Sequence, residues 1–278
     1  MHQTTRRAAS AASVLRSLGP SALLLVLATA CTSSPIDWSV DRSTPLGTDS
    51  ARVLAADGTL YPDTLLELAA RVSQPGPTVC PGSLRLARAS GSLYGAWWAA
   101  RPDSSALLLS ARSLDGGRHW SAPTAVDTSD HGVTGCQRVP PSIAADSASG
   151  YVHITYAMRA AEGPGLFFAH SMDEGVTFHA PVAILYGDRL GRTSVAADHD
   201  IVVVAFEDPN STRPRVGLAI SRTMGHIFEQ RILPLSEDVG TATRPLAAVS
   251  GRRIAVAWEQ RADTGAAAAL RIRVGTLR

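Results

Sequence analysis

The chain lacks one of the residue types that carry out covalent chemistry. All 26 of its Lys and Arg residues are arginine, because the sequence contains no lysine. This excludes lysine-dependent phosphate loops and Schiff-base enzymes. His153, His170 and His199 are isolated, and Cys80 and Cys136 have no His or Cys partner at the spacing of a metal site. The sequence therefore predicts neither a metal ion nor a cofactor.

The first thirty residues have the order of an export signal. Three arginines precede an apolar run over residues 21–28, which is too short to span a bilayer. Small residues then lead into Cys31, an order that resembles a bacterial lipobox, in which the cysteine is acylated and becomes the mature N-terminus. We expect a lipoprotein signal peptide over residues 1–30, a solvated tether over 31–50, and anchoring through Cys31 in the bacterial cell envelope. An ordinary signal peptide with an incidental cysteine is the alternative.

The charge of the chain gives no reason to expect a nucleic-acid partner. The formal net charge is +2, with 45% hydrophobic and 18% charged residues, which is a globular composition. Removal of Arg6, Arg7 and Arg16 with the signal leaves 23 arginines against 24 acidic residues. A nearly neutral protein has no electrostatic attraction for a phosphate backbone.

The remainder of the chain, residues 51–278, contains an internal repeat of roughly 50 residues. Each copy has a short apolar segment followed by a run rich in β-branched and aromatic residues. The short segments are Gly82–Leu86, Ser142–Asp146, Ser194–Asp198 and Pro245–Val249. Several short strands in each unit, at a fixed period, predict an all-β propeller with about four recognisable four-stranded blades.

A second motif follows the third predicted strand of three copies. Its serine, aspartate, glycine and aromatic positions are Ser113, Asp115, Gly117 and Trp120, then Ser171, Asp173, Gly175 and Phe178. A third copy over residues 221–228 keeps all but the aspartate. The carboxylate can accept bonds from turn N–H groups, and glycine supplies a positive φ. The motif resembles the Asp box, or BNR repeat, of the sialidase superfamily. The resemblance implies a sialidase-like β-propeller, with the two aspartates structural and on the face opposite the active site.

The cysteines can be placed on such a propeller. The innermost strand of each blade starts at the same face, and Cys80 and Cys136 precede the innermost strands of the first two blades. Since adjacent inner strands are neighbours, and an exported protein meets an oxidising compartment, we predict a disulfide between them. Two buried thiols are the alternative.

The same resemblance implies a ligand site. Sialidases hold the substrate carboxylate with three arginines, because a guanidinium pairs with a carboxylate through two parallel bonds. Arg138, Arg192 and Arg244 lie at or just before inner-strand starts, and Arg138-Val139-Pro140 resembles the family's R-I-P signature. We predict that these three arginines line the site. The alternative is that they pair with local acids, as Arg192 could with Asp188.

The catalytic groups of the family are not in their expected positions. Sialidases attack with a tyrosine activated by a glutamate and protonate the leaving group with an aspartate. Weak candidates here are Asp103, Tyr186, Glu207 and Glu259. The sequence therefore favours a propeller that binds glycans or acts as a surface scaffold. The alternative is an exo-sialidase, a glycoside hydrolase that removes terminal sialic acids.

Closure of the ring is a separate problem. The fourth copy stops after its third strand, so its outer strand is missing. We expect residues 51–79 to complete the ring, through Arg52–Leu54 or Leu65–Leu68. Otherwise the ring is small or open, or the gene is truncated.

Overall fold

The computed structural model describes residues 34–45, 52–54, 60–62, 78–229, 232–236, 240–262 and 266–278. The chain divides into two compact units, Met1–Pro35 and Ile36–Arg278, and all the strands belong to the second. The expected signal peptide, Cys31 and Leu65–Leu68 lie outside the described residues. Within the described ranges, no helix is long and apolar enough to cross a membrane.

The second unit contains four antiparallel sheets, each corresponding to one sequence repeat, and a separate two-stranded hairpin. Blade one contains β4 (Thr78–Val79) and β5 (Arg85–Ala89), which together form an interrupted inner strand, then β6 (Ser92–Ala100), β7 (Ala106–Ser113) and β8 (Thr124–Asp127). Blade two contains β9 (Ser142–Ala145), β10 (Val152–Ala160), β11 (Gly163–Ser171) and β12 (Val182–Tyr186). Blade three contains β13 (Thr193–Asp198), β14 (Ile201–Glu207), β15 (Val216–Ser221) and β16 (Leu233–Pro234). Blade four contains β17 (Thr241–Ser250), β18 (Arg253–Arg261), β19 (Ala269–Leu277) and β1 (Ile36–Pro45).

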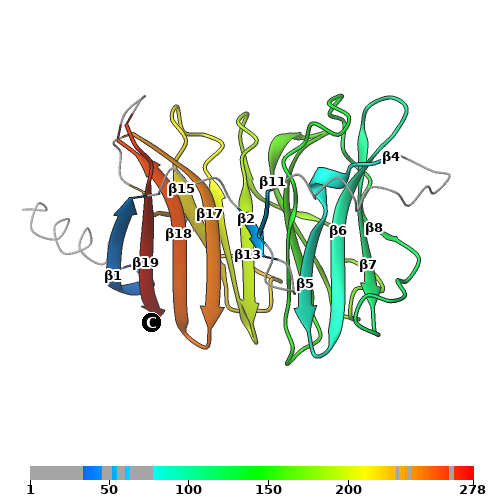
Figure 1. The fold of residues 1–278 in the computed structure, drawn as a ribbon, viewed down its shortest axis with the longest axis horizontal. Helices are drawn as coiled ribbons and strands as arrows, with labels where there is room; N and C mark the ends of the chain where they lie inside the picture. Colours follow the sequence, from blue (N-terminus) through cyan, green and yellow to red (C-terminus); the bar gives the residue numbers. More distant parts are fainter. Residues whose placement is uncertain are drawn as a thin grey trace, which may run out of the picture. The chain divides into compact units, whose positions relative to one another are not determined.

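The blades follow one another in the order of the sequence. The inner strands β5, β9, β13 and β17 contact their successors along this series, and Figure 1 shows blade one and blade four at its two ends. Four four-stranded antiparallel sheets in this arrangement confirm the predicted β-propeller architecture.

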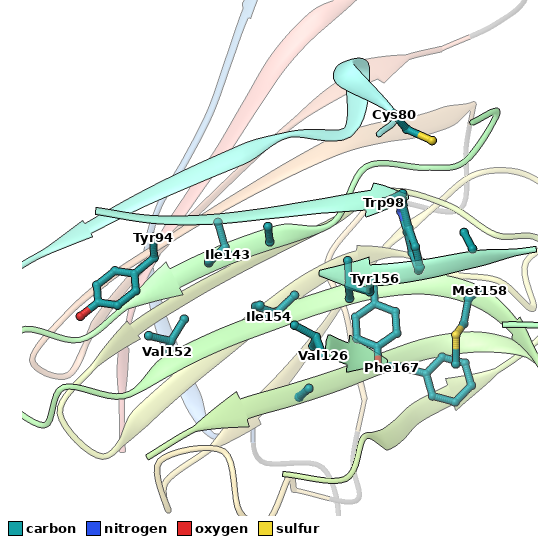
Figure 2. Close-up of a cluster of buried hydrophobic side chains, with 14 of the residues drawn as sticks. Cys80, Tyr94, Trp98, Val126, Ile143, Val152, Ile154, Tyr156, Met158 and Phe167 are labelled. Atoms are coloured by element: carbon teal, nitrogen blue, oxygen red, sulfur yellow. The ribbon is translucent and has the colours of Figure 1, made fainter. Parts of the chain in front are cut away.

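The hydrophobic core lies between the blades. Three clusters of buried side chains join blade one to two, two to three, and three to four. Figure 2 shows the first cluster, in which Trp98 meets Tyr156 edge-on with 5.8 Å between ring centroids. The second strands of the two inner blades, β10 and β14, are therefore covered on both faces, and β14 is buried from Ile201 to Phe206. This explains why the repeats contain continuous apolar runs instead of the alternation of a half-exposed sheet.

The outer strand of blade four comes from the N-terminal side of the repeats. β1 pairs antiparallel with β19, from Ile36 opposite Leu277 to Pro45 opposite Ala269. The prediction of a tether over residues 31–50 is thus wrong for Ile36–Pro45, and residues 51–79 do not supply this strand. Ile36 is buried and Trp38 packs against the core of blades three and four. Burial of these apolar side chains, which alternate with polar ones, stabilises the strand despite its polar composition.

The segment Arg52–Leu54, considered above as a closing strand, has a different partner. It forms β2, which pairs with β3 (Leu60–Pro62) as a separate two-stranded hairpin. Within the described strands, neither β2 nor β3 hydrogen-bonds to a blade.

The repeated Ser-x-Ala-Ala-Asp segments hold neighbouring blades together. Ser142 Oγ accepts a bond from Val195 N, and one repeat later Ser194 Oγ accepts one from Ala247 N, both at 3.0 Å. The aspartates make equivalent bonds at the other end of the inner strands. Asp146 accepts from His199 N at 3.2 Å, and Asp198 accepts from Gly251 N at 2.5 Å. Blade four has proline and valine at these two positions, and no fifth repeat follows it in the described chain.

The octapeptide turns share one hydrogen-bond pattern. In the first, Ser113 Oγ accepts from Gly117 N and donates to Asp115, both at 2.8 Å, and Asp115 accepts from His119 N at 2.9 Å. Ser171, Asp173, Gly175 and Thr177 repeat this arrangement in the second turn. Gly117 and Gly175 have φ values of 93° and 78°, which explains why glycine occupies this position.

The third turn keeps the pattern without its aspartate. Thr223 Oγ1 accepts from Ile227 N at 2.9 Å, so a hydroxyl takes the place of the carboxylate oxygen. Ser221 Oγ accepts from Gly225 N at 3.1 Å, as in the other two turns. The aromatic Phe228 packs on Phe168 of blade two at 4.9 Å between centroids. The turn therefore retains its structural role after the loss of the acid.

Candidate functional site

A cavity of about 500 Å³ lies where the inner strands begin. Residues from all four blades line it: Arg85, Leu86, Pro140, Pro141, Ser142, Ile143, Arg192, Thr193, Ser194, Arg244, Pro245, Leu246, Ala257, Trp258, Glu259 and Leu270. A third strand runs parallel to the inner strand of its own blade, so it ends at the opposite side of the blade. The octapeptide turns, which follow the third strands, therefore lie on the face opposite this cavity.

Arg192 brings a positive charge into the cavity. Its backbone N donates to Glu207 Oε2 at 3.2 Å. Among the residues that the structure describes, its guanidinium has no hydrogen-bond or ion-pair partner. An unpaired guanidinium in a cavity wall is available to bind an anion.

Arg85 provides a second positive charge beside it. Its Nη1 donates to the carbonyl oxygens of Leu84 at 2.6 Å and Gly82 at 3.2 Å, which hold the side chain in place. Burial, and then the nearby charge of Arg192, lower the pKa of the Arg85 guanidinium. Two like charges thus line the same cavity, at an energetic cost that a bound anion would relieve.

Arg244 has a different environment from these two. It lies at an irregularity in β17 with φ of 55°, a conformation that costs a non-glycine residue about 1–3 kcal/mol. Its guanidinium pairs with Glu259 at 2.5 Å. Its backbone N donates to Glu207 Oε1 at 2.8 Å, so the Glu207 carboxylate links the backbones of Arg192 and Arg244. The strained backbone is therefore held by carboxylates of blades three and four.

Gly191 makes this arrangement possible. A Cβ atom at residue 191 would lie 2.5 Å from the Glu207 Cβ and 2.8 Å from its Oε2. Only glycine lets the chain approach the Glu207 carboxylate closely enough to present the Arg192 N–H.

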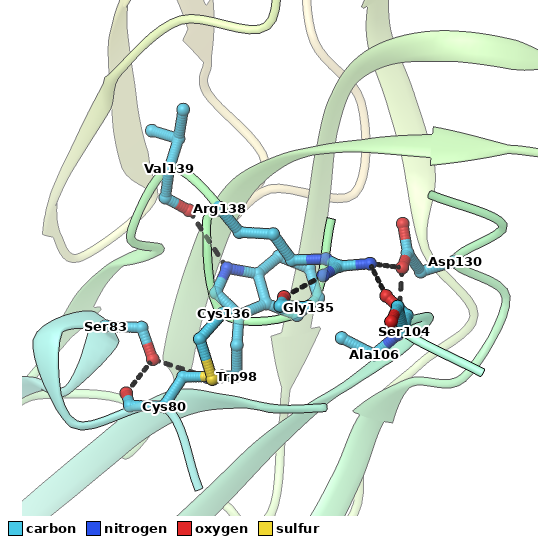
Figure 3. The surroundings of a disulfide bond; sticks show 10 residues. All are labelled: Cys80, Ser83, Trp98, Ser104, Ala106, Asp130, Gly135, Cys136, Arg138 and Val139. Carbon is cyan, nitrogen blue, oxygen red and sulfur yellow. Dashed lines mark hydrogen bonds and ion pairs between the residues drawn. A yellow bond between two sulfur atoms is a disulfide. The ribbon is translucent and has the colours of Figure 1, made fainter. Parts of the chain in front are cut away.

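Arg138 does not join the other predicted arginines. It forms an ion pair with Asp130, and their side chains are only 6% and 2% exposed. The same guanidinium donates to the carbonyl oxygens of Ser104, Gly132 and Gly135, as Figure 3 shows in part. Blade two contributes residues 140–143 to the cavity instead. The local-acid alternative therefore describes Arg138 and Arg244, whereas Arg192 has no acidic partner among the described residues.

The predicted disulfide is present next to this ion pair. Cys80 and Cys136 are bonded, with 5.2 Å between their Cα atoms and a sequence separation of 56 residues. Figure 3 shows the bond beside Trp98, whose Nε1 donates to Val139 O at 2.9 Å. The bond joins the interrupted inner strand of blade one to the connection that leads into blade two.

The four weak candidates for catalysis do not form one constellation. Asp103 accepts bonds from the N–H and hydroxyl of Ser105 and shapes a turn. Tyr186 lies on the outer strand of blade two against Phe167. Glu259 lines the cavity but pairs with Arg244, and Glu207 accepts the two backbone bonds described above. No tyrosine is among the described residues that line the cavity.

Comparison with known proteins identifies the class of fold. No protein-family model matches the sequence, and no curated protein matches it. The phage phi92 endosialidase is similar in structure, with a TM-score of 0.51 and 9% identity over 69% of this chain and 35% of that chain. A protein of unknown function from Dyadobacter fermentans has a TM-score of 0.50 and 19% identity, covering 68% of this chain and 51% of that one. The Hadza microbial sialidase Hz136 has a TM-score of 0.46 and 19% identity, covering 64% of this chain and 42% of that one.

These similarities concern the fold. The chain has the fold of a sialidase-like β-propeller with four blades. It spans between 35% and 51% of the length of the three similar structures.

Proposed function

We propose that this protein is an exported, lipid-anchored, sialidase-like propeller that binds an acidic glycan in the central cavity without hydrolysing it. The observation that carries the proposal is the uncompensated pair of guanidinium groups, Arg85 and Arg192, in a cavity of about 500 Å³. A sugar carboxylate would supply the missing negative charge and accept paired bonds from a guanidinium. Leu86 and Leu246, both well exposed, offer apolar surface beside the arginines for the face of a sugar ring.

The arrangement of acids favours binding over turnover. Hydrolysis of a glycoside needs a proton donor and a nucleophile or base on either side of the scissile bond. In the cavity, the carboxylate of Glu259 is occupied by Arg244. Asp103 and Tyr186 are outside the lining. The fold supports the second candidate function, exo-sialidase activity. The cavity does not present the proton donor and the nucleophile that this activity needs.

The ligand can be tested with a matched pair of small molecules. Titration calorimetry with sialic acid and with its methyl ester compares the same sugar with and without its charge. We expect binding of the acid, weaker or no binding of the ester, and loss of affinity as salt concentration rises. Equal affinity for the two forms would contradict recognition through the arginines.

Turnover is tested separately with a fluorogenic sialoside. We expect the mature protein to release no fluorophore above the level of a heat-denatured sample. Release at a rate proportional to protein concentration would replace the binding proposal with the exo-sialidase alternative.

Export and anchoring are supported by the N-terminal order of residues and by the disulfide, since disulfides persist in oxidising compartments. The test is the distribution of the protein between membrane and soluble fractions of a bacterial host. We expect wild type in the membrane fraction and Cys31→Ser in the soluble fraction or unprocessed. A Cys31→Ser protein that is still processed and still membrane-bound would contradict lipidation at this residue.

A further inference from the structure

Four of the eight histidines of the chain gather where blade two meets blade three. His153 belongs to β10 and His170 to β11, where they are cross-strand partners. His179 follows the second octapeptide turn, and His226 lies within the third. The cluster is therefore on the face opposite the cavity and has no part in the proposed glycan site.

His170 lies at the centre of this group. Its ring centroid is 4.7 Å from that of His179, which stacks on it, and 4.7 Å from that of His226, which meets it edge-on. The residue is 7% exposed, and its Nε2 has no hydrogen-bond partner in the described structure. A buried imidazole nitrogen without a partner loses its bond to water, which is unfavourable unless another group satisfies it.

The other two rings of this trio lie at the surface. His179 and His226 are exposed residues that follow or lie within surface turns. Neither side chain has a hydrogen bond or ion pair that would fix its ring within the described residues. Each can therefore turn about its side-chain torsions without breaking an existing bond.

We propose that His170, His179 and His226 bind a divalent transition-metal ion of the Zn²⁺ class across the junction of blades two and three. Imidazole is the commonest protein ligand for such ions, and three histidines leave a fourth tetrahedral position for water. Zn–N bonds of about 2.0–2.1 Å require the ligand nitrogens to approach to roughly 3.4 Å. In the described structure the ring nitrogens of the three histidines do not all lie within 4.8 Å of one another, so metal binding requires His179 and His226 to turn their nitrogens toward the Nε2 of His170.

A second group of potential ligands provides an internal comparison. One oxygen each of Asp146 and Asp198 and a ring nitrogen of His199 lie within 4.8 Å of one another. These carboxylates already accept bonds from Ser149 in the same turn and from His199 and Gly251 in the next blade. The acidic group is therefore occupied by structural bonds, whereas the Nε2 of His170 has no partner in the described structure.

The test is calorimetric titration of Zn²⁺ into the full chain, purified without a histidine tag. Co²⁺ absorbance then reports the coordination geometry. The informative variants are His179→Ala and His226→Ala, because both side chains are exposed and the fold does not depend on them. His199→Ala removes the competing group, and His119→Ala, at an equally exposed turn of blade one, is the matched control.

We expect one Zn²⁺ per chain and a tetrahedral Co²⁺ spectrum. Loss of a direct ligand should weaken binding by more than about 100-fold, since loss of an outer-shell partner alone costs about 10–100-fold. His199→Ala and His119→Ala should bind as wild type does. The proposal is overturned if wild type shows no stoichiometric binding, if His179→Ala and His226→Ala bind normally, or if only His199→Ala loses the ion.

Discussion

Arginines lie both in the segment that connects the first two blades and in the central cavity. They differ in whether an acidic side chain neutralises their charge. Arg138 is buried against Asp130 and three backbone carbonyls, beside the Cys80–Cys136 disulfide. Arg192 lines a cavity with no partner among the described residues and with Arg85 nearby. Both arginines precede an inner strand, so the position in the repeat does not decide the role. The presence of a local acid, Asp130, does.

The largest expected effect is the loss of stability when the buried ion pair of Arg138 with Asp130 is broken. Arg138→Ala leaves the Asp130 carboxylate buried and unpaired, and breaking a buried pair in this way costs about 3–5 kcal/mol. Urea unfolding should show this loss relative to Arg118→Ala, an exposed arginine on the opposite face. A loss below 1 kcal/mol would mean that the ion pair is dispensable. In that case Arg138 could belong to the ligand site after all.

The disulfide should have the next largest effect. The double replacement Cys80→Ser and Cys136→Ser frees a loop of 56 residues, for which disulfide loss typically costs about 2–4 kcal/mol. Wild type in reducing buffer should unfold at the same urea concentration as the double variant. An unchanged unfolding midpoint in both samples would show that the disulfide adds nothing to the stability of the fold.

The imidazole of His153 is buried without a hydrogen-bond partner in the described structure, and it responds by losing its charge. Burial, followed by the nearby charge of His170, lowers the pKa of His153 to about 3, and neither ring nitrogen has a partner within the described chain. Between pH 6.5 and pH 3 the unfolded chain therefore binds one more proton at this residue than the folded protein. The free energy of unfolding should decrease as pH falls, by at most about 1.4 kcal/mol per pH unit from this group.

His153→Leu tests that contribution because leucine cannot titrate. Its unfolding free energy should depend less on pH than that of wild type between pH 6.5 and pH 4. Parallel pH profiles for the two proteins would show that other groups cause the acid sensitivity.

The smallest expected stability effect is at the cavity. Arg192→Ala removes no ion pair seen between described residues and relieves repulsion with Arg85, so the free energy of unfolding should change by less than about 0.5 kcal/mol or rise slightly. Thermal unfolding of this variant beside Arg138→Ala measures the contrast directly. A large destabilisation by Arg192→Ala would indicate a structural role that the contacts do not reveal.

Repetition in the sequence is what made the fold predictable. The apolar runs, the octapeptide turns and the positions of Cys80 and Cys136 recur in register, and the blades and the disulfide follow from them. The sequence did not predict β1 because apolar residues alternate with polar ones in a mostly polar segment. This alternation indicates a strand only once β1 is known to pair with β19. A single sequence contains no signal for which distant strand completes a blade.

The site was less predictable because it depends on side-chain partners. The positions of Arg192 and Arg244 in the repeat predicted that both would line the cavity. The position of Arg138 could not show that it would form an ion pair with Asp130 instead. Arg85 was overlooked as a site residue although it lies in the inner-strand segment of blade one. Its proximity to Arg192 comes from the approach of blades one and three across the cavity, which no local pattern encodes.

The most direct test of the central claim is the affinity of Arg192→Ala for sialic acid, with Arg85→Ala alongside and Arg118→Ala as the control. Hydrogen bonds to charged groups contribute about 1.5–3 kcal/mol each, so each cavity variant should bind at least about tenfold more weakly. Arg118→Ala should bind as wild type does. Cavity variants that remain folded and bind with wild-type affinity would contradict the account.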